Sequence, residues 1–259
     1  MRIDIAFFLL GLLFAVSPTA ASFAQEKTYA NLSKRLVKAV RQEQDPTAML
    51  DSLASVPADT LAAELDKDNA RKAFWINIYN AQIQYVLGKN PEKFEERPGF
   101  FKEELFVVAG ENLSFEEVEH GIIRGSQSPI GLGIFPKLFP KKFERKMRVK
   151  KIDPRIHFAL NCGAKSCPPV AAYDYQKIDQ QLDTISRRYL DNHASYDAEA
   201  GVVYAPKLLS WFSGDFGLCK KKKLKFLAKY GVLPPKTKAK LKYNEYDWTL
   251  MLDNYVSLE

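Results

Sequence analysis

The residues best suited to chemistry gather in one segment, Asp153–Pro169, which reads DPRIHFALNCGAKSCPP. It contains His157, Cys162 and Cys167. A cysteine nucleophile requires thiolate character and a base close by. Cys167 lies between Gly-Ala-Lys-Ser and Pro-Pro, and this predicts a stiff loop that presents Cys167 better than Cys162.

Three chemistries compete for this segment. Cys167 could be a nucleophile with His157 or His120 as its base. A Cys162–Cys167 disulfide would instead pin the loop and remove both thiols from nucleophilic work. A metal site of His157 and the two cysteines is disfavoured, because the H-x4-C-x4-C spacing matches no common zinc pattern, and we predict no metal and no cofactor. The spacing alone favours a disulfide or a buried thiol over a nucleophile.

A second candidate group is Glu119, His120 and Arg124, on a helix predicted over Phe115–Arg124. At about 100° per residue, Glu119 falls on the apolar side, His120 at its border and Arg124 on the far side. One hypothesis is that Glu119 charges or orients a site in which His120 is the acid or base. The structural alternative is a buried Glu119 paired with an arginine such as Arg155.

Asn77 and Asn80 form a third group, on a helix predicted over Asp68–Gly88. This helix is apolar on most sides, so both amides are expected inside, where they must find hydrogen-bond partners. They could clamp the backbone of the Asn161–Pro169 loop, and packing is the favoured role. The aromatic runs Trp211-Phe212 and Tyr246-Asp247-Trp248 are interpreted as core anchors.

These groups must be positioned by short strands and several helices. Ile156–Leu160 is predicted as a strand, with His157 on the face opposite Ile156, Phe158 and Leu160. Strands without a regular βαβ rhythm favour a single α+β domain. The other predicted elements are strands at Leu105–Ala109 and Gly201–Ala205 and helices at Ile178–Leu190 and Lys220–Tyr230.

Composition bounds the class of protein. The chain has 259 residues, of which 46% are hydrophobic, enough for one sizeable core. The net charge of +7 is concentrated in two basic stretches, Lys137–Lys151 and Leu218–Asn244. Such a basic face could contact anionic surfaces, although a solvated face is the favoured interpretation. Nucleic acid is not expected as a partner, because regularly interleaved aromatic residues are missing.

The N-terminus predicts export. Ile5–Val16 is apolar but too short to span a membrane, and Ser22-Phe23-Ala24 fits a cleavage site. We therefore predict a signal peptide at residues 1–24 and a periplasmic or secreted protein, with an uncleaved anchor as the alternative. The remaining organisation is predicted as an N-terminal helical segment (25–50), the main domain (51–251) and a tail (252–259). In an oxidising compartment the three cysteines leave at least one thiol without an internal partner.

Five motifs in order resemble a known family, the domain of unknown function 547. The likeness covers roughly Asp51–Met251, and Met251 stands where the family usually has Asn. The motifs are AFWINIYNA (Ala73–Ala81), SFEEVEHGIIR (Ser114–Arg124), DPRIHFALNCGAKSCPP (Asp153–Pro169), LLSWFSGDF (Leu208–Phe216) and YDWTL (Tyr246–Leu250).

The resemblance does not imply a particular reaction, because no reaction is agreed for the family. Members look like exported or membrane-associated bacterial proteins, or plant and animal multidomain proteins. A distant likeness to papain-like and transglutaminase-like cysteine enzymes, used only as an analogy, would make Cys167 or Cys162 the nucleophile and His157 or His120 the base. The first hypothesis is a cysteine-type hydrolase or acyltransferase of peptide or amide bonds, with Cys167 as the nucleophile and a peptide or another envelope component as the substrate. The second is a non-catalytic envelope binding or structural domain with a loop pinned by a Cys162–Cys167 disulfide.

Overall fold

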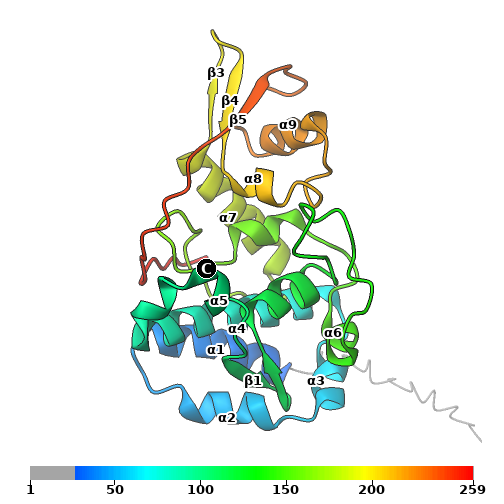
Figure 1. The fold of residues 1–259 in the computed structure, drawn as a ribbon, viewed down its shortest axis with the longest axis vertical. Helices are drawn as coiled ribbons and strands as arrows, with labels where there is room; N and C mark the ends of the chain where they lie inside the picture. Colours follow the sequence, from blue (N-terminus) through cyan, green and yellow to red (C-terminus); the bar gives the residue numbers. More distant parts are fainter. Residues whose placement is uncertain (1–26, 259) are drawn as a thin grey trace, which may run out of the picture.

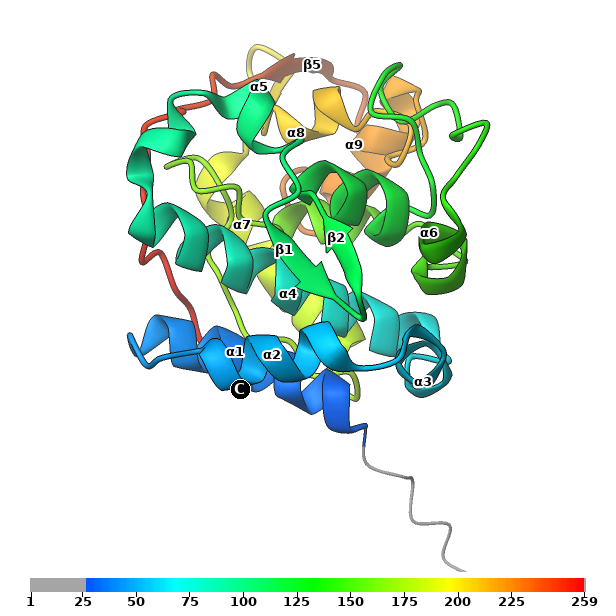
Figure 2. The ribbon, with the colours of Figure 1, turned by 60° about the horizontal axis from the view of Figure 1, so that its bottom comes forward.

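The computed structural model describes residues 27–258, so the predicted signal peptide lies outside the described residues. The chain begins with three helices, α1 (Thr28–Arg41), α2 (Thr47–Ser55) and α3 (Ala58–Glu64). They lie beside α4 (Asp68–Lys89), the longest helix of the described part, whose side chains are buried on most of its circumference (Figures 1 and 2). The predicted buried helix is therefore confirmed, with its end one residue beyond Gly88.

The rest of the chain alternates short helices and short strands. The predicted α+β class is confirmed, because small sheets and separate helices share one hydrophobic core. The elements are η1 (Pro91–Phe94), α5 (Arg97–Phe100), β1 (Phe106–Val108), β2 (Glu111–Leu113), η2 (Glu117–Ile123), α6 (Lys142–Met147), η3 (Pro154–Phe158), α7 (Ile178–His193), β3 (Ser195–Asp197), β4 (Val202–Ala205), α8 (Leu208–Trp211), α9 (Lys220–Lys229) and β5 (Lys240–Tyr243).

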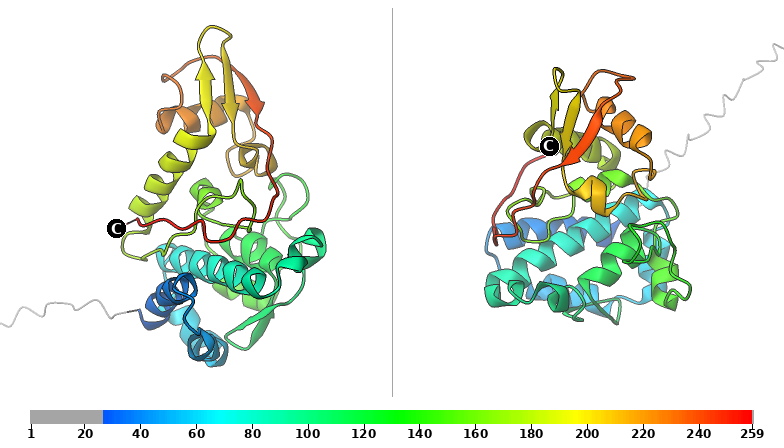
Figure 3. Two further views of the ribbon diagram at one scale, coloured as in Figure 1. Left: turned by 90° about the vertical axis from the view of Figure 1, so that its left-hand side faces the viewer. Right: turned by 45° about the horizontal axis from the view of Figure 1, so that its top comes forward.

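Two small sheets complete the architecture. Strands β1 and β2 form an antiparallel hairpin. Strands β3, β4 and β5 form the second sheet, in which β3 pairs antiparallel and β5 parallel to β4. This sheet lies at the end of the molecule opposite α1 and α2, with α9 beside it (Figures 1 and 3). No helix among the described residues is long and apolar enough to cross a membrane.

The helix predicted over Phe115–Arg124 is present, but its turns are wider than expected. Ser114 and Glu117 bond reciprocally at its start, as a capping box should. From Glu117 to Ile123 it is a π-helix, and the amide of Arg124 donates to the carbonyl of Glu119, five residues earlier. One such turn brings Arg124 back toward the side of Glu119, so the prediction of Arg124 on the far side is wrong; its side chain is buried.

The strand predicted at Ile156–Leu160 is also wrong, because Pro154–Phe158 is a 3-10 helix. Asp153 caps it by accepting from the amide of Arg155, and proline occupies its first position. The turn removes the two-faced alternation of a strand. His157 is consequently buried together with its apolar neighbours and does not stand on an opposite face.

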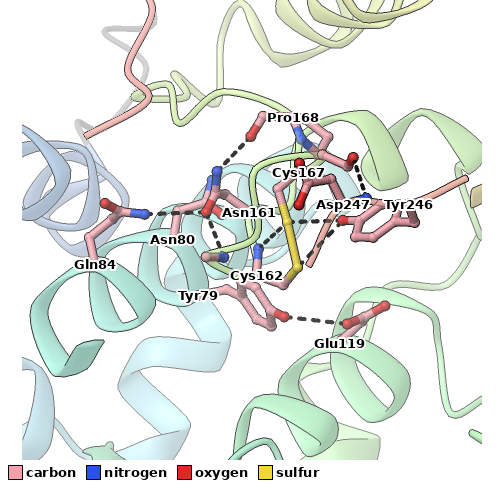
Figure 4. Close-up of a disulfide and its surroundings, with 12 residues drawn as sticks. Tyr79, Asn80, Gln84, Glu119, Asn161, Cys162, Cys167, Pro168, Tyr246 and Asp247 are labelled. Carbon is pink, nitrogen blue, oxygen red and sulfur yellow. Dashed lines mark hydrogen bonds between the residues drawn. A yellow bond between two sulfur atoms is a disulfide. The ribbon is translucent and has the colours of Figure 1, made fainter. Parts of the chain in front are cut away.

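Buried amides on α4 hold the segment that follows η3. Asn80 accepts from the backbone amide of Asn161 and donates to the carbonyl of Ala159, both at 2.8 Å. Asn161 in turn donates to the carbonyl of Pro168 at 2.7 Å, closing the loop on itself (Figure 4). Asn80 thus clamps the loop as predicted, whereas Asn77 bonds both backbone groups of Tyr173.

The C-terminal segment runs along the outside of the same loop (Figure 3). The amide of Lys165 donates to the carbonyl of Thr249, and that of Met251 donates to the carbonyl of Gly163, both at 2.8 Å. Further along, the amide of Val170 donates to the carbonyl of Asn254 at 2.7 Å. The loop is therefore held between α4 on one side and the chain end on the other.

Replacing the clamp should cost stability. We expect Asn80→Ala to lower the free energy of unfolding by about 2 to 4 kcal/mol, because it leaves a buried carbonyl and a buried amide without partners. Urea unfolding followed by circular dichroism measures this. Asn112→Ala, at an exposed asparagine of β2, is the control and should change stability by less than about 0.5 kcal/mol. Equal effects of the two variants would contradict the clamp.

Candidate functional site

A pocket of about 350 Å³ opens beside the clamped loop. This volume is near the lower end of the range for small-ligand sites. Its walls are mainly apolar and aromatic, with a few polar groups among them. It is lined by Tyr79, Pro98, Phe101, Lys102, Glu116, Glu119, His120, His157, Leu160, Cys162, Cys167, Pro168, Leu208, Trp211, Phe212, Tyr246 and Trp248. The structure therefore brings Glu119, His120, His157 and Cys167, predicted as catalytic, around one cavity.

Cys162 and Cys167 form a disulfide in the pocket wall, with their Cα atoms 6.2 Å apart (Figure 4). Cys162 is half-buried, whereas Cys167 is only 3% exposed. The prediction that the loop presents Cys167 better than Cys162 is therefore wrong for the oxidised protein. The reason is that Cys167 faces inward, where its sulfur accepts a hydrogen bond from the amide of Cys162 at 3.0 Å. Cys219 is a free, exposed thiol.

Tyr246 places a hydroxyl against the disulfide. Its oxygen lies 3.1 Å from the sulfur of Cys167 and 3.6 Å from that of Cys162 (Figure 4). The hydroxyl is brought there by the C-terminal segment that pairs with the loop. In the oxidised protein the sulfurs have no hydrogen to give, so the hydroxyl donates. Were the bond reduced, the same two donors, Tyr246 and the Cys162 amide, could stabilise a thiolate on Cys167.

Glu119 supplies a carboxyl group that can exchange a proton at neutral pH. Burial raises its pKa from 4.5 to about 7, against the lowering effect of the Arg124 guanidinium, and the negative charge of Asp215 adds to the rise. The hydroxyl of Tyr79 lies 3.5 Å from its Oε2 atom. A carboxyl group with a pKa near the working pH is suited to both proton donation and proton uptake. Arg155 pairs with Asp153 and Asp179 and not with Glu119, so it is the wrong arginine, and the arginine whose charge acts on the buried Glu119 is Arg124.

A buried ionic cluster supports the pocket from behind. Arg124 donates from Nε and Nη2 to the two carboxylate oxygens of Asp215, at 2.7 and 2.9 Å. His157 Nε2 also bonds Asp215, at 2.8 Å, and its ring stacks on Phe212 with centroids 3.7 Å apart. Burial opposes ionisation of Asp215, but the hydrogen bonds from His157 and Arg124 outweigh it and lower its pKa. Burial lowers the pKa of His157.

His120 is held as a neutral imidazole. Burial and the nearby Arg124 lower its pKa to about 3. Arg124 Nη1 bonds His120 Nδ1, and since a guanidinium only donates, Nδ1 accepts and the proton resides on Nε2. His120 can therefore offer a hydrogen bond from Nε2 to a bound group, but it is a weak base. Neither histidine is hydrogen-bonded to a cysteine among the described contacts.

Of the four residues predicted for binding, Asn77, Asn80 and Arg155 do not line the pocket. The side-chain amides of Asn77 and Asn80 are hydrogen-bonded to backbone groups of other segments. Cys162 is the residue of this set that lies in the pocket wall. Arg155 instead bonds Asp153 and Asp179, at 2.6 and 2.8 Å from Nη2. Its role as a site residue is not supported by this geometry. Among residues 27–258 no group of three or more His, Cys, Asp or Glu side chains is arranged to hold a metal ion.

Some residues at and behind the pocket have no predicted role in the sequence. Tyr79, in the pocket wall, and Asp215, behind it, appear there only as members of longer motifs. The two aromatic runs were predicted as core anchors, yet Trp211, Tyr246 and Trp248 pack together at the pocket with ring centroids 4.7 to 5.6 Å apart. One available signal was the polar residue inside LLSWFSGDF, because an aspartate embedded among aromatic residues must have a buried partner.

Asp215 should contribute strongly to the stability of the fold. We expect Asp215→Asn to lower the free energy of unfolding by about 3 to 5 kcal/mol, because it leaves the buried Arg124 charge uncompensated. Thermal or urea unfolding measures the effect. The matched control is Glu103→Gln, which breaks the exposed pair with Lys93 and should cost no more than about 1 kcal/mol. An Asp215→Asn protein as stable as this control would contradict the importance of the cluster.

The raised pKa of Glu119 predicts a pH-dependent stability. Its favourable contribution is complete below the unfolded-state value of 4.5 and is lost as the pH rises through about 7, because the fold then holds a buried anion. Glu119→Gln avoids this loss. We expect the variant to gain about 1 to 3 kcal/mol relative to the wild type between pH 5 and pH 8. Urea unfolding across this range tests it, and Asn112→Ala should follow the wild-type curve. A constant difference would show that Glu119 has an ordinary pKa.

Comparison with known proteins gives one assignment. No curated protein and no solved structure matches the chain. The model of a family described as "Protein of unknown function, DUF547" matches residues 63–190. This range contains Tyr79, Glu119, His120 and both disulfide cysteines, while Asp215 lies beyond it. The resemblance seen in the sequence motifs is therefore confirmed, and residues 63–190 match this family of proteins of unknown function.

Proposed function

We propose that the protein is a cysteine-type hydrolase or acyltransferase of peptide or amide bonds, with Cys167 as the nucleophile once the disulfide is reduced. The observation that carries the proposal is the shared cavity: the Cys162–Cys167 pair and Glu119, whose pKa is about 7, line the same pocket. A sulfur nucleophile and a proton-exchanging carboxyl group around one apolar cavity are what acyl transfer requires.

The oxidised form would be inactive, because neither sulfur is a thiolate. A dithiol reductant would attack the sulfur of the half-buried Cys162 and expel Cys167 as a thiolate. The second thiol of the reductant would then displace Cys162, so that the reductant leaves as a disulfide and the protein holds two thiols. The amide of Cys162 and the hydroxyl of Tyr246, which both reach the sulfur of Cys167, favour its departure as the anion.

In the acyl-transfer step the Cys167 thiolate would attack the carbonyl carbon of the substrate. A carbon–sulfur bond forms, the carbon–nitrogen bond breaks, and protonated Glu119 gives its proton to the leaving amine. Ionised Glu119 then takes a proton from water or from an acceptor nucleophile, which attacks the thioester and releases Cys167. A carboxyl group with a pKa of about 7 can perform both proton transfers at neutral pH.

Neither histidine would act as the base for Cys167 that the sequence predicts. His120, neutral and with its proton on Nε2, is suited to donate a hydrogen bond to the oxygen that gains charge during attack. His157 is committed to Asp215 and stacked on Phe212, so its role is to hold the wall of the pocket. The aromatic walls around Trp211 and Trp248 favour an acyl group with an apolar or aromatic side chain.

Thiol reactivity tests the proposal. In reduced protein at pH 7 we expect iodoacetamide to modify Cys167 about ten-fold faster than the exposed Cys219, because the Tyr246 hydroxyl and the Cys162 amide reach the sulfur of Cys167 and stabilise a thiolate there. Peptide mapping by mass spectrometry, performed as a time course, gives both rates in one sample. In the unreduced protein only Cys219 should be modified.

The roles of Tyr246 and Glu119 are tested separately. Tyr246→Phe, which removes only the hydroxyl, should slow modification of Cys167 by iodoacetamide while leaving the rate at Cys219 unchanged. Glu119→Gln should change the alkylation rate of Cys167 by less than about two-fold, because the thiolate attacks without a proton transfer, but it should slow the release of an acetyl group from Cys167 at pH 7 by about ten-fold. Cys167 reacting no faster than Cys219 after reduction, or a disulfide that resists dithiothreitol in the folded protein, would favour the non-catalytic, loop-pinned domain instead.

A further inference from the structure

The loop between η2 and α6 exposes an unusual amount of apolar surface. Within the short stretch from Ser128 to Phe139, four large side chains stand out into solvent: Ile130 is 80% exposed, Phe135 62%, Leu138 85% and Phe139 92%. Leu132 and Ile134 are also classed as exposed. Soluble surfaces carry such residues singly, whereas clusters of them mark sites of interaction with other molecules or with membranes.

The base of this apolar loop is fixed on the protein. The amide of Ser128 donates to the carbonyl of Phe135 at 2.8 Å, and the amide of Gly214 donates to the carbonyl of Leu132 at 2.8 Å. Gly133 lies so close to Arg124 and Asp215 that any added side chain would collide with them. The exposure of the apolar side chains is therefore a property of an anchored loop.

A basic surface follows directly along the chain. Figures 1 and 2 both draw the loop and α6 on the same edge of the molecule. At Gly125, three residues before the loop begins, a depression of about 500 Å³ is lined by four cationic side chains, those of Arg71, Arg145, Arg148 and Lys150. Within residues 27–258 none of these four side chains forms an ion pair with a carboxylate. The three arginines donate hydrogen bonds to backbone carbonyls or to a hydroxyl.

We propose that the apolar loop, residues 128–139, and the basic depression lined by Arg71, Arg145, Arg148 and Lys150 together bind the surface of an anionic phospholipid bilayer. Leu138 and Phe139, the most exposed apolar pair, would enter the boundary between headgroups and acyl chains. The uncompensated arginines and Lys150 would meet headgroup phosphates, for which the basic depression offers room.

The pairing of these two features selects the bilayer as the occupant. An apolar cluster alone would fit many partners. Here it is joined to a stretch, Lys137–Lys151, that carries eight Lys and Arg residues against a single Glu. Apolar side chains beside cationic ones match a surface that is anionic outside and apolar beneath. None of the residues of the loop or of the basic depression lines the pocket, so bilayer binding does not depend on the proposed acyl-transfer chemistry.

Vesicle flotation tests this with the disulfide intact. We expect the protein to float with vesicles of phosphatidylcholine containing phosphatidylglycerol and to bind poorly to vesicles of phosphatidylcholine alone. Leu138→Ser/Phe139→Ser should weaken the partition coefficient by roughly ten-fold or more, because two apolar anchors are lost. Arg145→Gln/Lys150→Gln should weaken it by a similar factor and reduce its dependence on salt.

Two matched variants control for lost apolar area and lost charge elsewhere. Val107→Ser/Leu218→Ser removes two exposed apolar side chains, and Lys220→Gln/Lys221→Gln removes two charges from the exposed side of α9. Both should bind like the wild type. The proposal is overturned if the wild type does not bind anionic vesicles, or if the loop variants and their controls bind equally. Circular dichroism and thermal unfolding confirm that each variant folds.

Discussion

The carboxylate of Asp215 lies in the interior, where its charge has to be compensated by the protein itself. It is compensated by Arg124, which directly follows η2, and by His157 from η3, so one group ties together three segments that are far apart in the sequence. A buried charge that loses its partner costs several kcal/mol, and this penalty fixes the relative position of the segments. Glu119 and His120 belong to the π-helix that Arg124 directly follows, so their place at the pocket depends on the same cluster. Burial disfavours the charged form of each group, and it therefore raises the pKa of Glu119 and lowers that of His120.

The second constraint is the double support of the loop that carries the disulfide. Asn80 on α4 holds its inner side and the C-terminal segment holds its outer side. This support brings Tyr246, more than seventy residues away along the chain, to the sulfur of Cys167. The pocket is thus built from both halves of the chain. Its reactive sulfur, its hydroxyl and its carboxyl group converge only in the folded protein.

Much of the fold was predictable from local patterns. The buried helix α4, the capping box at Ser114 and the strand β4 follow from periodicity and from residue types that act on near neighbours. The predictions that proved wrong were those that assumed the regular geometry of one type of element. The far-side position of Arg124 assumed the angular step of an α-helix, and the strand at His157 overlooked that Asp-Pro is also the start of a helical turn.

The candidate site was predicted only in part, for a related reason. His157, Cys162, Cys167, Glu119 and His120 could be named because each lies in a short, distinctive motif. Asp215 and Tyr246 could not be assigned a role, because their significance comes from contacts over more than fifty residues of chain. Asn80 and Asn77 looked equivalent on the helix, and only the folded structure shows that one holds the disulfide loop and the other holds Tyr173.

The most direct measurement of the central claim is capture of an acyl-enzyme. Reduced protein would be treated with p-nitrophenyl acetate and the position of the acetyl group determined by mass spectrometry, with Cys162→Ser/Cys219→Ser used to leave a single thiol. The account predicts rapid acetylation of Cys167, followed by release of acetate that is faster in this variant than in the same variant carrying Glu119→Gln. Acetylation confined to surface lysines, or an acetyl group on Cys167 that forms no faster than on a model thiol, would contradict it.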